Sequence, residues 1–216
     1  MTINLKEKFN GQVYCITCFE RSLNRGTRFV AGKMLGAGVR LIQYREKYRS
    51  DREKYDECLW LRKVTKKYGA ILIVNDNPAL AVACGADGLH LGQDDLPVPA
   101  ARKLLKKNMF IGVSTHSPLQ ARKAVKEGAD YIGVGPVFKT DTKSGVCKPA
   151  GLEYVRYVSR NINLPFVAIG GIKEHNIAGV IRAGATCICL VTEITESKDI
   201  KSKISRIIPL LSQEKG

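Results

Sequence analysis

Short apolar runs rich in β-branched residues recur along the chain and alternate with stretches in which apolar residues have helical spacing. The runs follow one another at intervals of about 25 residues, which is typical of strand–helix units. Because the runs are apolar throughout, they indicate a parallel sheet covered by helices. The predicted strands are Val13–Ile16, Val39–Ile42, Ala70–Val74, Gly88–Leu91, Phe110–Val113, Tyr131–Val134, Pro165–Ile169 and Cys187–Val191. The predicted helices include Asp51–Tyr68, Ala100–Lys106, Pro118–Glu127 and Asn176–Ala183.

A weak internal repeat precedes four of these strands. Its copies are Gly36-Ala37-Gly38, Gly85-Ala86-Asp87, Gly128-Ala129-Asp130 and Gly184-Ala185-Thr186. The glycine of each copy suits the left-handed end of a helix, and the alanine permits a tight turn into the sheet. Eight strand–helix units favour a closed barrel over an open doubly wound sheet. We therefore predict an α/β fold, a (β/α)8 TIM barrel, as a single domain over residues 1–216.

Composition narrows the class of protein without changing this picture. The 216 residues are 44% hydrophobic and 25% charged, which excludes a disordered chain, a coiled coil and a collagen. No apolar run is long enough to cross a bilayer, and the first residues lack the apolar core of a signal peptide. The seven cysteines are odd in number and scattered, which predicts reduced thiols and a cytoplasmic protein.

The net charge of +15 has two interpretations. A basic face is typical of nucleic-acid binding, but no aromatic–basic RNA-binding signature or helix-turn-helix pattern is present. The same field would steer a polyanionic small molecule toward the protein. We expect phosphorylated small-molecule substrates, with neither nucleic acid nor membrane as a partner, and the sequence leaves a homo-oligomer open.

The active site of a parallel barrel lies at the carboxyl ends of its strands, so the polar residues at those ends are the candidates for chemistry. After the second strand, the period of two places Gln43, Arg45 and Lys47 on one face, inward if Leu41 points inward. Two inward cations would be destabilising unless an anion or carboxylates meet them, and a phosphate would satisfy both. Alternatively, Arg45 and Lys47 belong to an exposed loop.

Acidic residues follow the third and fourth strands. Asp76 comes after Asn75, and Asp95 ends the run that begins at His90. Such residues commonly cap the next helix. Two carboxylates on the same rim would also hold Mg²⁺ together with substrate phosphates and water.

The fifth and sixth strands lead into hydroxyl-rich loops. Ser114 and His116 follow the fifth strand and would bind a substrate or relay protons, although His116 is also typical of a solvated loop. Thr140, Thr142 and Lys143 follow the sixth strand and suit a phosphate, or form an ordinary polar loop.

The last two strands end in Gly170-Gly171 and in Val191-Thr192. Loops at these positions commonly form the phosphate site of a barrel, and Gly-Gly lets the backbone approach an anion closely.

Four cysteines offer a different chemistry. Cys15 and Cys18 have a spacing used by redox and zinc sites, and Cys187 and Cys189 lie on the strand that closes the barrel against the first. Because Cys15 lies inside a strand and not at a helix N-terminus, small apolar packing is the favoured interpretation.

Taken together, the strand ends resemble thiamine phosphate synthases from about Tyr14 to Thr192. The motifs that match are Gln43-Tyr44-Arg45-Glu46-Lys47, Val74-Asn75-Asp76, Gly88–Asp95, Gly112–His116, Thr140-Asp141-Thr142-Lys143 and Ile169-Gly170-Gly171-Ile172. Six motifs in the right order form a far more specific signal than any one of them.

The resemblance implies the condensation of 4-amino-2-methyl-5-pyrimidinylmethyl diphosphate with a thiazole phosphate, or its carboxylated form. The products would be thiamine phosphate and diphosphate, formed by dissociative loss of diphosphate and capture of the pyrimidine carbocation by the thiazole nitrogen. It implies Mg²⁺ as cofactor on Asp76 and Asp95. Implied for the pyrimidine diphosphate are Gln43, Arg45, Lys47, Asn75, Lys143 and Ser114, and for the thiazole phosphate Thr140, Thr142, Gly171, Val191 and Thr192. Lys143, Arg45 and Lys47 would be the catalytic cations.

Three positions depart from the family pattern: Thr192 replaces a usual Ser, Glu193 puts an acid beside the phosphate site, and Lys139 stands where Pro is common. A thiazole tautomerase, which shares the barrel and the thiazole phosphate site, is an alternative with less use for the Asp76–Asp95 pair. A non-catalytic barrel that binds a phosphorylated metabolite or RNA is another.

Overall fold

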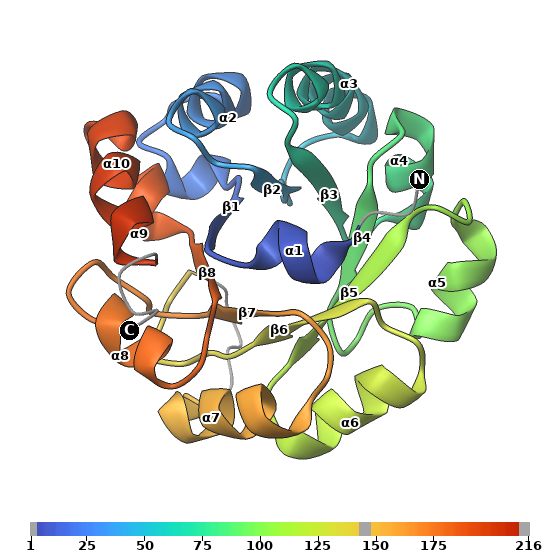
Figure 1. Ribbon diagram of the computed structural model, residues 1–216. Helices are drawn as coiled ribbons and strands as arrows, with labels where there is room; N and C mark the ends of the chain where they lie inside the picture. The colour runs from blue at the N-terminus through green and yellow to red at the C-terminus, as the bar shows by residue number, and fades with distance from the viewer. Residues whose placement is uncertain (1–3, 143–147, 212–216) are drawn as a thin grey trace.

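The computed structural model describes residues 4–142 and 148–211 as a closed ring of parallel strands surrounded by helices (Figure 1). Each strand pairs with the next along the chain, and the first pairs with the last. The strands are β1 Gln12–Ile16, β2 Leu41–Tyr44, β3 Ile71–Asn75, β4 Gly88–Leu91, β5 Phe110–Thr115, β6 Tyr131–Val134, β7 Phe166–Ile169 and β8 Cys187–Leu190. All eight predicted strands are confirmed, and the fold is the predicted (β/α)8 barrel.

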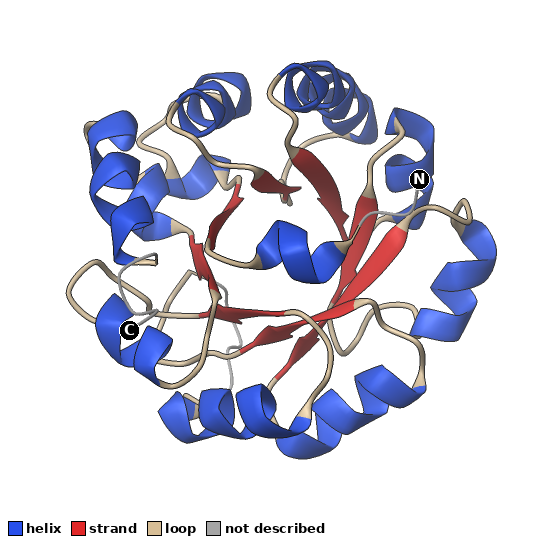
Figure 2. Cartoon of the chain, in the orientation of Figure 1, coloured by secondary structure: helices blue, strands red, loops and turns tan. Residues whose placement is uncertain are grey.

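Helices cover the outside of the ring and alternate with the strands (Figure 2). Their starts follow the capping rules: Ser50 and Glu53 form a capping box at α3, and the Asn77 and Ser117 side chains accept from the helices that follow them. The helices are α1 Leu5–Phe9, α2 Thr27–Gly36, α3 Asp51–Lys67, α4 Pro78–Cys84, α5 Val98–Leu104, α6 Pro118–Lys126, α7 Gly151–Asn161, α8 Ile177–Arg182, α9 Thr192–Thr195 and α10 Ile200–Leu210, with a 3-10 turn, η1, at Phe19–Arg21.

The repeated Gly-Ala motif does what its sequence predicts in three of its four copies. Gly85, Gly128 and Gly184 have φ values of 66°, 85° and 100°, a region that residues with a Cβ rarely adopt. In the first copy the predicted glycine, Gly36, is the last residue of α2, and Gly38 takes the positive φ of 102°.

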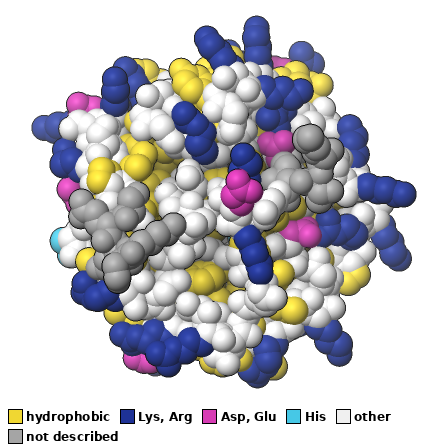
Figure 3. All heavy atoms as spheres, viewed as in Figure 1, with side chains coloured by type: hydrophobic (Ala, Val, Ile, Leu, Met, Phe, Trp, Pro, Cys, Tyr) yellow, Lys and Arg dark blue, Asp and Glu magenta, His cyan; other side chains and the backbone are white. Residues whose placement is uncertain are grey.

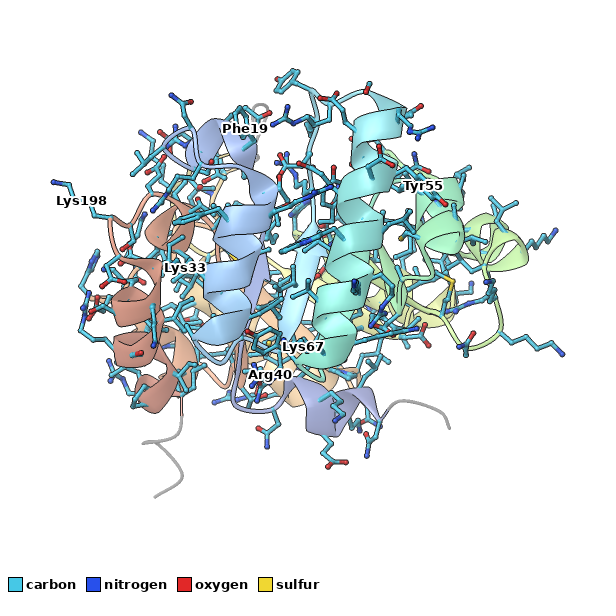
Figure 4. All side chains as sticks on the ribbon, turned by 90° about the horizontal axis from the view of Figure 1, so that it is seen from above. Phe19, Lys33, Arg40, Tyr55, Lys67 and Lys198 are labelled. Atoms are coloured by element: carbon cyan, nitrogen blue, oxygen red, sulfur yellow. The ribbon has the colours of Figure 1, made fainter. Side chains whose placement is uncertain are left out.

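Apolar side chains form two cores, one between the strands and the helices and one inside the ring. Leu41, Ile73 and Tyr131 belong to the inner core, and α1 adds Phe9 to it. The helix α1 therefore covers the amino-terminal end of the barrel (Figure 1), and Phe19, in the loop after β1, lies at the opposite end (Figure 4).

On the face seen in Figure 3, Lys and Arg side chains are spread over the surface and along its edge and do not gather in one patch. No helix of the described residues combines the length and apolar character that a membrane span requires.

Candidate active site at the carboxyl ends of the strands

A pocket of about 440 Å³ opens at the carboxyl ends of the strands. Nine of the thirteen predicted site residues line it, and they come from the ends of six strands. They are Gln43, Arg45, Asn75, Ser114, Thr140, Thr142, Gly171, Val191 and Thr192. The structure thus brings together groups that are separated by up to 149 positions in the sequence.

The remaining four predicted residues differ in their positions. Lys47 lies exposed beyond the last residue of β2 and does not line the pocket, in agreement with the loop alternative for this residue. Asp76 is exposed, and Asp95 lines a smaller neighbouring hollow. Lys143 lies outside the described residues.

The end of β2 sends alternate side chains in opposite directions. Gln43 and Arg45 line the pocket, and the Arg45 N–H donates to the Thr17 hydroxyl (3.0 Å). Glu46 is buried on the other side, where it accepts hydrogen bonds from the Phe19 N–H (2.9 Å) and the Thr27 hydroxyl (3.1 Å). Burial raises the pKa of Glu46 above its usual value, opposed by these hydrogen bonds. Glu46 therefore holds the loop after β1 in place, and its negative charge lies away from the pocket that Arg45 lines.

A chain of buried hydrogen bonds crosses the floor of the pocket. Gln43 Nε2 donates to the Tyr14 hydroxyl (2.9 Å), which lies 3.0 Å from the Tyr131 hydroxyl. Tyr131 lies 2.7 Å from His90 Nδ1, and His90 Nε2 lies 2.9 Å from the Ser114 hydroxyl. Burial raises the pKa of both tyrosines, which keeps their hydroxyls protonated. The chain ends at two of the predicted substrate-binding residues, Gln43 and Ser114.

Two glycines make room for the aromatic part of this floor. A Cβ at Gly112 would collide with the Tyr131 ring, and a Cβ at Gly88 would collide with the Phe110 ring. The two rings meet edge to face with their centroids 5.9 Å apart, a favourable aromatic geometry.

The opposite wall of the pocket is rich in hydroxyl groups and backbone amides. Thr140 and Thr142 hydrogen-bond to each other (3.1 Å), and Lys173 Nζ donates to the Thr192 hydroxyl (3.0 Å). Gly171 has a φ of 64°, and a Cβ there would collide with the backbone of Lys139. This wall therefore combines close backbone approach, hydroxyl groups and a cation, which is the chemistry of a phosphate site.

Glu193, the acidic departure at this wall, is already paired. Lys203 Nζ donates to its carboxylate (2.9 Å), and Lys173 Nζ lies 3.4 Å from the other oxygen. Burial favours its neutral form, but the Lys203 hydrogen bond and the two lysine charges lower the pKa of Glu193 overall. Its negative charge is therefore balanced within the protein and does not repel a phosphate unopposed.

Asp76 and Asp95 follow adjacent strands, as predicted. The Asp76 N–H donates to the His90 carbonyl (2.8 Å), and the Gly92 N–H donates to the Asp95 carboxylate (2.6 Å). Among the described residues no group of three or more metal-binding side chains is present. Two carboxylates fit Mg²⁺ as part of an oxygen shell that substrate phosphates and water complete.

His116 lies at the pocket, whereas the cysteines have other surroundings than a reactive thiol requires. His116 lines the pocket with Nδ1 on the Gly135 carbonyl. All six cysteines among the described residues are buried with free thiols. Burial raises the pKa of Cys15, Cys187 and Cys189, which disfavours the thiolate that redox and zinc chemistry need.

Among the pocket features that sequence reasoning missed are four: Tyr14, Tyr131, Lys173 and the pairing role of His90. Tyr14 and Tyr131 read as apolar strand positions. Lys173, two residues after Gly171, was the one of the four with a usable signal, since it follows the predicted phosphate-binding glycines.

The closed parallel barrel, with its polar pocket at the carboxyl ends of the strands, defines a (β/α)8-barrel enzyme. The sequence matches the model of a protein family, thiamine monophosphate synthase, over residues 13–194. The chain therefore belongs to the thiamine monophosphate synthase family, whose enzymes act in thiamine biosynthesis.

Individual relatives agree with this assignment over nearly the whole chain. A thiamine-phosphate synthase of Pelotomaculum thermopropionicum is 55% identical over 94% of this chain and 93% of its own length. One of Caldicellulosiruptor saccharolyticus is 48% identical over 99% of this chain and 98% of its own. The solved structure of a thiamine phosphate pyrophosphorylase from Pyrococcus furiosus superimposes with a TM-score of 0.90 at 31% identity, covering 99% of this chain and all of that one.

Proposed function

We propose that the enzyme joins 4-amino-2-methyl-5-pyrimidinylmethyl diphosphate to a thiazole phosphate, carboxylated or not, and releases thiamine phosphate and diphosphate. When the thiazole carries the carboxyl group, carbon dioxide is released as well. The observation that carries the proposal is the division of one pocket into two walls. Gln43, Arg45 and Ser114 offer amide, guanidinium and hydroxyl groups on one side, and Thr140, Thr142, Gly171 and Thr192 offer a phosphate-binding surface on the other. Two anionic substrates would thus lie side by side.

The residues present favour a dissociative reaction. The bond between the pyrimidine methylene carbon and the diphosphate oxygen breaks, and both electrons leave with the oxygen. Arg45 would bind the growing negative charge by a bidentate contact, and Lys143 remains a predicted further cation. Lys47 was predicted as another, but it lies exposed outside the pocket. The thiazole nitrogen then donates its electron pair to the methylene carbon of the pyrimidine cation.

The pocket must also position the two substrates relative to each other. The threonine hydroxyls and the Gly171 backbone would hold the thiazole phosphate, so that the ring nitrogen faces the methylene carbon. Bound by Asp76 and Asp95, Mg²⁺ would supply positive charge to the departing diphosphate. No protein nucleophile is required, which agrees with the buried, protonated thiols.

An assay with the purified chain distinguishes the candidate functions. With both substrates and Mg²⁺, a synthase releases diphosphate and forms thiamine phosphate, and omission of either substrate stops product formation. A tautomerase would convert the thiazole carboxylate phosphate alone and leave the pyrimidine diphosphate intact. A regulatory barrel would bind a phosphorylated compound or RNA and form no product. Diphosphate release that does not require the thiazole phosphate would contradict the proposal.

A further inference from the structure

The hydrogen-bonded chain across the pocket floor has a fixed order of donors and acceptors. The five members come from five strands, and the links measure 2.9, 3.0, 2.7 and 2.9 Å from Gln43 to Ser114. A Gln NH₂ group only donates, so the first link runs from Gln43 to Tyr14. The remaining three links need three hydrogens. When the His90 imidazole is in its neutral form, Tyr14, Tyr131, His90 and Ser114 together supply four, so one hydrogen is left over.

The position of the spare hydrogen follows from burial. Tyr14 is 2% exposed and Tyr131 is fully buried, and a hydroxyl hydrogen left there would have no acceptor among the described residues. An unmade hydrogen bond in the interior is destabilising. Ser114 is only partly buried and lines the pocket, so its hydrogen is the one available to a ligand.

With the spare hydrogen on Ser114, the donor and acceptor of every other hydrogen bond follow. Tyr14 donates to Tyr131, Tyr131 donates to His90 Nδ1, and His90 carries its hydrogen on Nε2 and donates to Ser114. With its amide nitrogen turned toward Tyr14, Gln43 presents its carbonyl oxygen as the acceptor at the other end. This order follows from the amide orientation that the structure gives Gln43, with Nε2 toward the Tyr14 hydroxyl.

We infer that Tyr14, Tyr131 and His90 are positioning residues that set the pocket to accept a hydrogen bond at Gln43 and to donate one at Ser114. Resting on the proposed function, this makes the site complementary to the edge of a 4-aminopyrimidine, where an amino N–H stands beside an unprotonated ring nitrogen. A 4-oxo pyrimidine presents the opposite pattern, a carbonyl oxygen beside a ring N–H. The enzyme therefore rejects the oxo compound not through Gln43 and Ser114 alone. The buried residues that hydrogen-bond to these two groups also contribute to the rejection.

The test compares the amino substrate with its 4-oxo analogue, both as the diphosphate. For each enzyme we would measure kcat/KM with the thiazole phosphate, and the Kd of each pyrimidine alone by calorimetry. The wild type should prefer the amino compound by on the order of 10³-fold, as sites built to pair a polar group do. In Tyr131→Phe the chain is cut at its centre, His90 loses its bias, and the preference should shrink by about tenfold or more.

Two further variants keep the result unambiguous. Tyr14→Phe frees the Gln43 amide and should also lower the preference. Tyr154→Phe is the matched control, because the Tyr154 hydroxyl is also buried but donates to Thr115 (2.7 Å), which is not part of the row of hydrogen bonds from Gln43 to Ser114. This variant should keep the wild-type preference. Melting temperatures report folding.

An unchanged preference in Tyr131→Phe and Tyr14→Phe would overturn the inference, as would an equal loss in Tyr154→Phe or a wild type that takes both compounds equally. If the wild type makes no product but binds the amino compound with the expected preference, the proposed function fails and the inference about polarity stands. If the wild type binds neither pyrimidine, both fail.

Discussion

Asp76 has a φ of 61°, a left-handed conformation in which Asp and Asn are the best tolerated residues after glycine. The substitution Asp76→Asn therefore keeps the backbone and removes only the charge. If Asp76 holds Mg²⁺ against a departing diphosphate, kcat should fall at least about 100-fold while the melting temperature stays within a few degrees. Asp94→Asn, an exposed neighbour of Asp95, is the control and should retain full activity. Full activity of Asp76→Asn at an ordinary Mg²⁺ concentration would contradict the assignment of Asp76 as a Mg²⁺ ligand.

Lys173 brings an additional cation to the phosphate wall through its contact with Thr192. Its side chain is 36% exposed, so solvent weakens its effect. We expect Lys173→Gln to raise the KM for the thiazole phosphate about fivefold, equivalent to ~1 kcal/mol, with little change for the pyrimidine diphosphate. Lys198→Gln removes a lysine that projects into solvent (Figure 4) and serves as the control. A change in the KM of the pyrimidine diphosphate alone would contradict the assignment of Lys173 to the thiazole phosphate.

How far single residues could be predicted depended on whether their position follows from local periodicity. Gln43 was predictable because a period of two ties it to Leu41, which lies in the inner core. Lys47 lies beyond Tyr44, where the strand ends and alternation stops, so the same rule says nothing about it. The contact of Tyr14 with Tyr131 joins residues 117 positions apart and depends on barrel closure and register, which no local pattern specifies.

At the level of elements, β5 and β6 pack through a glycine opposite an aromatic ring. In Gly112→Ala the new methyl group would overlap the Tyr131 ring, and overpacking of this kind costs about 1–3 kcal/mol. Urea unfolding should show this loss as a lower midpoint. Gly36→Ala adds a methyl group at the end of α2, where nothing lies within 4 Å, and should leave the midpoint unchanged or higher. Equal stability of the two variants would refute the packing account.

The helix α10 is tied to the phosphate wall by Lys203, which contacts both Glu174 (2.9 Å) and Glu193 (2.9 Å). Lys203 and Arg206 lower the pKa of Glu174, and the pKa of Glu193 is lowered although burial opposes it. A carboxylate whose pKa is lowered by folding stabilises the fold fully at pH values above its ordinary pKa of 4.5. This stabilisation is lost as the pH falls through the lower pKa of the folded state.

Lys203→Met should therefore lower stability by up to about 1 kcal/mol near pH 7 and reduce its dependence on pH below 4.5. The measurement is the urea midpoint from pH 3 to pH 7. A variant that loses stability equally at pH 3 and at pH 7 would show that packing, and not charge, makes the contact important.

The elements themselves were largely readable from the sequence because each strand is a local apolar run with a glycine or polar stop. The helix α1 has five residues, of which Phe9 alone is buried, and its role in covering the barrel end appears only once the ring is closed.

On the scale of the whole molecule, α1 covers one end of the barrel (Figure 1). The pocket lies at the other end, where the strands finish. Net charge of +15 suits anionic substrates, whose approach a positive field favours. The two-wall arrangement of the pocket is the central claim, since both substrates must bind together for the bond to form.

The most direct test is product analysis with the purified chain, both substrates and Mg²⁺, run in parallel with Arg45→Gln. The account predicts thiamine phosphate and diphosphate in equal amounts from the wild type. Arg45→Gln should lose at least about 100-fold in kcat, because it removes the guanidinium that meets the charge on the leaving diphosphate. Undiminished turnover in Arg45→Gln, or diphosphate released without an equal amount of thiamine phosphate, would contradict it.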